Sequence, residues 1–100
     1  MTPHYDVVLD EDVSKFLRDL DKGESKYIRN ILKKRLATAP KDYGSPMTGE
    51  KYKELGIWKL NTSRWRIFYK IDEAKQRVLV AIIEKRNEGT YTRIERKLFG

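Results

Sequence analysis

Residues Ile57–Ile71 read IWKLNTSRWRIFYKI, and this stretch decides the fold. Its first part, Ile57–Asn61, is a short strand signal, and Asn61–Arg64 supplies polar turn residues. The second part, Trp65–Ile71, alternates strictly. One face carries Trp65, Ile67, Tyr69 and Ile71, and the other carries Arg66, Phe68 and Lys70. A period of two is typical of a strand with one face against a core, so the stretch predicts two adjacent strands joined by a tight turn.

Further strand signals lie on both sides of this stretch. Arg77–Lys85 is rich in valine and isoleucine, and it follows a polar turn at Asp72–Gln76. Near the start of the chain, Tyr5–Leu9 alternates over a few residues, which predicts a short strand. The last segment, Tyr91–Phe99, predicts either a final strand turn or a short amphipathic helix.

Two amphipathic helices are expected between the first strand and the later ones. Asp10 offers an N-cap for the first, whose apolar stripe is Val13, Phe16, Leu17 and Leu20. Asp21 or Ser25 begins the second, and Pro40 ends it. Its stripe is Ile28, Ile31, Leu32, Leu36 and Ala39. Residues 40–56 contain two prolines and three glycines and are expected to form a loop, with a short ordered piece near Tyr52–Leu55.

The order strand, helix, helix, strand, strand, strand indicates the α+β class. The expected architecture is a mostly antiparallel sheet with the helical hairpin packed on one face. With 100 residues the chain forms a single domain, residues 1–100. The sheet face opposite the hairpin carries Arg66 and Lys70, and it is the candidate working surface.

Composition narrows the chemistry. The net charge is +7, divided between −3 in residues 1–23 and +10 in residues 24–100, which suits an anionic partner. There is no cysteine and one histidine, His4, which disfavours thiol catalysis and a zinc site. The acidic residues gather in the first helix, so no metal is expected. No signal peptide or membrane-length apolar run is seen, so a cytoplasmic protein is expected.

The central stretch, together with Glu84–Tyr91 (EKRNEGTY), resembles the signature of the RelE/ParE toxin superfamily over nearly the whole chain. The resemblance implies the RelE-like fold and a toxin of a type II toxin–antitoxin pair, without a cofactor. Its partners would be a cognate antitoxin and, through the antitoxin, operator DNA. RelE-like members cleave mRNA in the ribosomal A site without metal, whereas ParE-like members share the fold and poison DNA gyrase.

The resemblance also implies roles for single residues. Arg66 matches the arginine that holds phosphate, and Arg86 matches the one that stabilises the transition state. Tyr91 matches the tyrosine that stacks on the base and takes part in proton transfer. Lys59 matches one of two strand lysines, but Ile57 occupies the position of the other. By position, Lys85, Arg64 and Lys53 are candidates to substitute for it and to contact RNA.

Each of these residues also has a structural interpretation. Arg66 could pair with an acid, Arg86 with Glu84 or Glu88, and Tyr91 could anchor the tail. Lys59 could guard a sheet edge. Three functions stay open on the sequence: a ribosome-dependent endoribonuclease, a gyrase-directed toxin that acts by binding, and a degenerate member that binds only its antitoxin.

Overall fold

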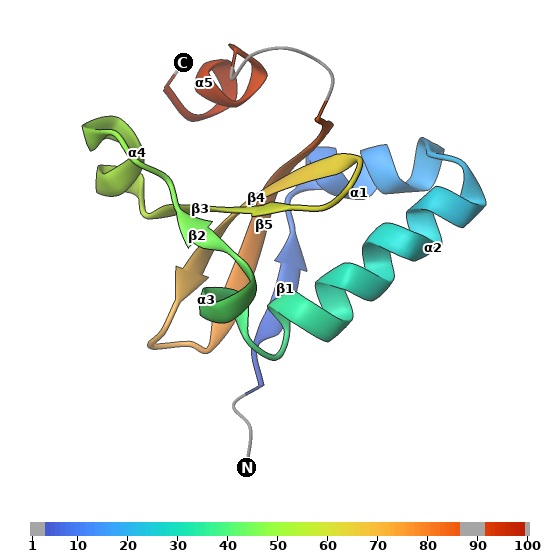
Figure 1. Ribbon diagram of the computed structural model, residues 1–100, viewed down its shortest axis with the longest axis horizontal. Coiled ribbons are helices and arrows are strands. Elements are labelled where there is room, and N and C mark those ends of the chain that lie inside the picture. Colours follow the sequence, from blue (N-terminus) through green and yellow to red (C-terminus); the bar gives the residue numbers. More distant parts are fainter. Residues whose placement is uncertain (1–3, 87–91, 100) are drawn as a thin grey trace.

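The computed structural model describes residues 4–86 and 92–99. The sheet has the strand order β1-β5-β4-β3-β2 (Figure 1). Its strands are β1 (Asp6–Leu9), β2 (Ser45–Pro46), β3 (Ile57–Asn61), β4 (Trp65–Asp72) and β5 (Arg77–Lys85). β1 runs parallel to β5, and the other neighbours are antiparallel. The predicted α+β class with a mostly antiparallel sheet is therefore confirmed.

The predicted helical hairpin is present as α1 (Glu11–Asp19) and α2 (Lys22–Ile31), and α2 continues into a π-helical turn, η1 (Leu32–Leu36). The side chain of Asp10 accepts a hydrogen bond from the backbone amide of Asp12 and so caps α1. The second cap is Asp21, which accepts from the amide of Gly23 at 3.0 Å. Ser25, the alternative cap, lies buried within α2.

The segment expected to be a loop, residues 40–56, is more ordered than its composition indicates. It holds α3 (Pro40–Tyr43), β2 and α4 (Glu50–Leu55). Pro40 begins α3, a position that suits proline because the first amide of a helix has no intrahelical partner. α4 confirms the ordered piece expected near Tyr52–Leu55. The tail forms α5 (Thr92–Phe99), the helical one of the two forms expected for it.

The main core lies between the sheet and the α1–α2 hairpin. The helices contribute the apolar stripes predicted from the sequence, and the sheet contributes one face of every strand from β1 to β5 except the short β2. The buried members are Tyr5, Val13, Leu17, Ile28, Ile31, Leu32, Leu36, Leu60, Trp65, Ile67, Tyr69, Val78, Val80 and Ile83. Both tryptophans belong here: Phe16 meets Trp65 edge-on at 5.7 Å, and Trp58 stacks on Tyr69.

A second, smaller core covers much of the opposite sheet face. Ile57, Phe68 and Ile82 project from it and are buried with Met47 beneath Tyr52 and Leu55 of α4 and Leu98 of α5. Figure 1 shows α4 and α5 away from the hairpin. Phe68 is fully buried. The face predicted to be an open working surface is therefore partly closed. Phe68 is covered, and Arg66 and Lys70, the polar residues predicted on this face, lie half-buried on either side of it along β4.

One irregularity in β5 sets which residues reach that face. Phe68 pairs with Ile82, but the next residue, Tyr69, pairs with Val80, so Ala81 is an extra residue in β5. Such a bulge reverses the alternation of the strand. Val80 therefore faces the main core, whereas Ile82 and, after it, Glu84 face the other side.

We expect Tyr69→Phe to lower the free energy of unfolding by about 1–3 kcal/mol, because it leaves a buried carbonyl without its donor. The Tyr69 hydroxyl donates to the carbonyl oxygen of Pro40 at 2.6 Å, and burial raises the pKa of this hydroxyl, so it stays a donor. Urea unfolding measures the change. Tyr43→Phe, at a tyrosine that is 51% exposed, is the control and should have little effect. Equal stability of the two variants would contradict this account of Tyr69.

Candidate functional site

A row of polar side chains crosses three strands of the second sheet face, at the end where β4 begins. Arg66 of β4 lies opposite Asn61 of β3 on one side and Glu84 of β5 on the other. Lys59 lies on the same face of β3 as Ile57, opposite Phe68. It is thus a diagonal neighbour of Arg66, a relation that places Cα atoms about 7–8 Å apart in an antiparallel pair. The structure therefore brings Lys59 and Arg66 together beside an acid.

Arg66 and Glu84 form an ion pair, as the structural interpretation of Arg66 anticipates. Nη1 of Arg66 lies 3.9 Å from Oε1 of Glu84, and their side chains are 20% and 2% exposed. Within residues 4–86 and 96–99, whose burial is described, Glu84 is the only charged residue in the buried class. Taking a carboxylate out of water costs several kcal/mol, so a cation beside it is required.

Arg86 is held at the same end of the sheet by the turn between β3 and β4. Its Nη1 donates to the carbonyl oxygen of Thr62 at 2.9 Å. Its backbone amide donates to the carbonyl oxygen of Arg64 at 3.0 Å. Thr62 in turn accepts from the amide of Trp65 through its hydroxyl and is itself buried. The exposed Arg86 side chain is therefore tied to a rigid turn close to the row of Arg66.

The other predicted RNA contacts lie around this end or farther away. Arg64, in the turn, pairs with Glu24 of α2 at 3.0 Å, although its side chain is 67% exposed. Lys85 is exposed and lies opposite Trp65 at the end of β5. Lys53 is exposed on α4, which covers the second core. Tyr91 lies outside the described residues, so its predicted role is not addressed by the structure.

Sequence reasoning did not place Glu84 in this site. Without the extra Ala81, regular alternation along Arg77–Lys85 would put Glu84 on the same face as Val78 and Val80, inside the main core. An unpaired charge in the main core would be costly, so a carboxylate in this apolar strand indicates that the alternation is broken before it. This indication becomes clear only when Arg66 is seen to pair with Glu84 across the two strands.

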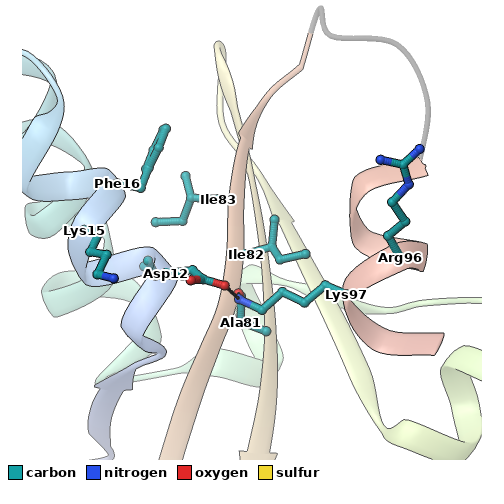
Figure 2. Close-up of a pocket in the computed structure, with 9 residues that line it drawn as sticks. Asp12, Lys15, Phe16, Ala81, Ile82, Ile83, Arg96 and Lys97 are labelled. Atoms are coloured by element: carbon teal, nitrogen blue, oxygen red, sulfur yellow. Dashed lines mark hydrogen bonds and ion pairs between the residues drawn. The ribbon is translucent and has the colours of Figure 1, made fainter. Parts of the chain in front are cut away.

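A cleft of about 540 Å³ lies between α1 and α5, alongside β5. Figure 2 shows Lys97 of α5 reaching across β5 toward Asp12 at the start of α1. Its ammonium group donates to the carbonyl oxygen of Ala81 at 2.6 Å and lies 3.2 Å from Asp10 and 3.3 Å from Asp12. These contacts tie α5 to Asp10, which directly follows β1, to the start of α1 and to the bulge at Ala81.

A second ionic cluster lies at the opposite end of β4. Glu73, in the turn after β4, is 2.8 Å from the ammonium group of Lys41 and accepts from the hydroxyl of Tyr5. Lys41 lowers the pKa of Glu73. The cluster joins α3 to the start of β1 and lies at the end of β4 opposite to Arg66. We therefore assign it a structural role and no part in the candidate site.

No group of three or more histidine, aspartate or glutamate side chains among the described residues is arranged to hold a metal ion. No helix of the described chain has the length and apolar character needed to cross a membrane.

Solved structures with this fold include RelE toxins, alone or bound to antitoxin. The RelBE2 toxin–antitoxin complex from Mycobacterium tuberculosis matches with a TM-score of 0.73 and 20% identity over 88% of this chain and 97% of that one. The isolated E. coli RelE toxin matches with a TM-score of 0.66 and 18% identity over 96% and 99%. The RelE–RelB complex from Pyrococcus horikoshii OT3 gives 0.56 and 18% over 89% and 100%. No protein-family model and no curated protein matches the chain. The chain therefore has the RelE fold that the strand motif predicts.

Acid should release α5 from the rest of the molecule. The amide of Asp12, and next the ammonium group of Lys97, lower the pKa of Asp10 below its ordinary value of 3.8. A lowered carboxyl pKa contributes stability that is present above the ordinary value and is lost as the pH falls through the folded-state value. Hydrogen exchange of the α5 amides should accelerate, relative to those of β4, as the pH falls from about 5 to 2.

Lys97→Met is the control for this experiment. It removes the cation, so α5 should exchange faster at neutral pH and show little further relative change on acidification. Exchange of α5 that follows β4 at every pH in both proteins would contradict the role assigned to Lys97.

Proposed function

We propose that this protein is the toxin of a type II toxin–antitoxin pair and that it is a metal-free endoribonuclease, which cleaves mRNA on the ribosome and so inhibits translation in the cytoplasm. The observation that supports the proposal is the placement of Lys59, Arg66 and Arg86 toward the same end of a RelE-fold sheet. The neighbours with this fold include RelE in complex with its antitoxin RelB, which supports an antitoxin partner here as well.

The chemistry proposed is attack of a ribose 2′-hydroxyl on the adjacent phosphate. The pentavalent phosphate gathers negative charge, which fixed cationic donors stabilise. Arginine suits this task because its planar guanidinium stays protonated and can meet two phosphate oxygens at once. We assign the phosphate to Arg66 and the developing charge to Arg86. Lys59, one row away, is assigned to proton transfer or charge stabilisation, and Tyr91 to base stacking and proton transfer.

The remaining cations extend the binding surface. Arg64 and Lys85 border the same end of the sheet, and we propose that they contact RNA on either side of the cleaved bond. Lys53 projects from α4, away from the row, and is proposed as a more distant RNA contact. Residues 24–100 carry a net charge of +10, which favours binding to the phosphates of mRNA and of the ribosome.

Ribosomes translating a reporter mRNA test the proposal. The purified protein should cut the mRNA at codon-spaced positions, seen by primer extension, only when ribosomes are present. Arg86→Ala should reduce cleavage by at least about 10²-fold, because it removes a fixed donor to the transition state. The variant should keep its fold, since Arg86 is exposed.

The matched control is Arg77→Ala, at the other end of the same strand and also exposed. It should cut the mRNA at the wild-type rate. Intact mRNA with the wild-type protein would contradict the ribonuclease proposal, and full cleavage by Arg86→Ala would contradict the site assignment. The cognate antitoxin is sought as a small protein that co-purifies with the toxin and prevents cleavage.

A second candidate function is inhibition of DNA gyrase by binding, as in ParE-like toxins. The observation that favours it is Ile57, which stands where RelE-like nucleases have a second strand lysine. Ile57 is 1% exposed and belongs to the second core, so no cation occupies this position. Gyrase–DNA cleavage complexes that accumulate in the presence of the protein, with mRNA left intact, would support this function instead.

A further inference from the structure

The strand motif does not account for the carboxylate of Glu84. It lies on the face of Arg66 and Lys59, at the end of the sheet to which Arg86 is tied. It is 2% exposed, and its neighbours on that face nearer the middle of the sheet, Phe68 and Ile82, are apolar and buried. An acid among cations that are assigned to bind phosphate weakens the attraction for that phosphate, so its presence needs a reason.

Stability does not supply the reason. Replacing a buried ion pair by apolar residues of similar volume is often neutral or stabilising. A methionine at position 84 would extend the second core, which already includes Phe68 and Ile82. The carboxylate is therefore better explained by what it does to Arg66 than by what it adds to the fold.

The geometry places the carboxylate of Glu84 at ion-pair distance from one end of a planar group. Oε1 of Glu84 lies 3.9 Å from Nη1 of Arg66, directly across the β4–β5 pair, and Arg66 is 20% exposed while Glu84 is enclosed. A guanidinium has five N–H donors in one rigid plane. A carboxylate fixed in the sheet can thus set the direction of that plane without using all of its donors.

We propose that Glu84 is a positioning residue for Arg66, which orients the guanidinium so that its outward donors meet the phosphate at the bond to be cut. The proposal rests on the proposed ribonuclease function. A general base must come within hydrogen-bond distance of the hydroxyl it deprotonates, and the enclosed Glu84 is poorly placed for that. It acts through Arg66, not on the substrate.

Single-turnover cleavage of ribosome-bound mRNA separates orientation from binding. Misplacing a catalytic group by about 1 Å can cost about 10²-fold in rate. Glu84→Met should therefore lower the rate at saturating protein by about 10²-fold, while the half-saturating concentration changes by less than about threefold. Its melting temperature is recorded for comparison and is expected to fall, because removing one partner of an ion pair leaves the charge of Arg66 uncompensated, so the rates are compared well below both melting temperatures. Glu84→Gln is the second variant, because it keeps the shape if the methionine disturbs packing.

The control is Glu11→Gln, at an exposed glutamate on α1, which should leave the rate unchanged. The decisive comparison adds Arg66→Gln. If Glu84 acts through Arg66, the double variant Arg66→Gln/Glu84→Met is no slower than Arg66→Gln alone. Losses that multiply would overturn the proposal. So would wild-type rates in Glu84→Met, or a pH–rate profile whose acidic limb disappears in Glu84→Gln, since that would mark a proton acceptor.

A readout that needs no cleavage keeps this proposal separate from the proposed function. The Nε–Hε signal of Arg66 in NMR spectra should report an ordered guanidinium in the wild type and a mobile one in Glu84→Met. If wild-type protein leaves mRNA intact, the ribonuclease function fails, and the Arg66 signal still decides whether Glu84 orients it. An equally ordered Arg66 in both proteins would overturn the positioning role.

Discussion

The insertion of Ala81 into β5 decides what both faces of the sheet carry. Before it, Val78 and Val80 project into the main core, and after it Ile83 takes over that place. The same insertion directs Ile82 toward the second core and brings Glu84 beside Arg66. Ala81 also offers its carbonyl oxygen to Lys97, so α5 is fastened where the strand changes its alternation. The packing, the polar row and the position of the tail helix thus share one cause.

The second face has an apolar middle that is covered and polar residues beyond it. α4 and α5 bury the apolar middle through Tyr52, Leu55 and Leu98, which belong to the second core and not to the main one. At the end where β4 begins, the cations must coexist. Like charges on neighbouring strands repel each other. The carboxylate of Glu84, directly across the β4–β5 pair from Arg66, offsets part of this repulsion.

The sequence predicted the helices and strands well because their bounds depend on interactions between residues that are close in sequence. Asp10 and Asp21 cap their helices by accepting hydrogen bonds from amides two residues ahead, and the bounds of β3 and β5 match the strand segments that polar turns delimit in the sequence. The burial of Phe68 depends on α4 and α5, which are distant in sequence. The bulge at Ala81 has no local mark in a run of valine and isoleucine. The site residues on β3 and β4 could therefore be placed from sequence, but their acidic neighbour could not.

The same geometry bears on the choice between a nuclease and a toxin that only binds. A binding surface gains affinity from exposed cations that adapt to the partner, and it has no need of a carboxylate enclosed in the sheet. A transition state lasts too briefly for side chains to reorganise around it, so catalysis depends on donors that are fixed beforehand. Arg66 is paired with Glu84 across the two strands, and Arg86 donates a hydrogen bond to the carbonyl oxygen of Thr62. Two guanidinium groups constrained in this way favour a surface that stabilises developing charge, even though Ile57 leaves it one lysine short.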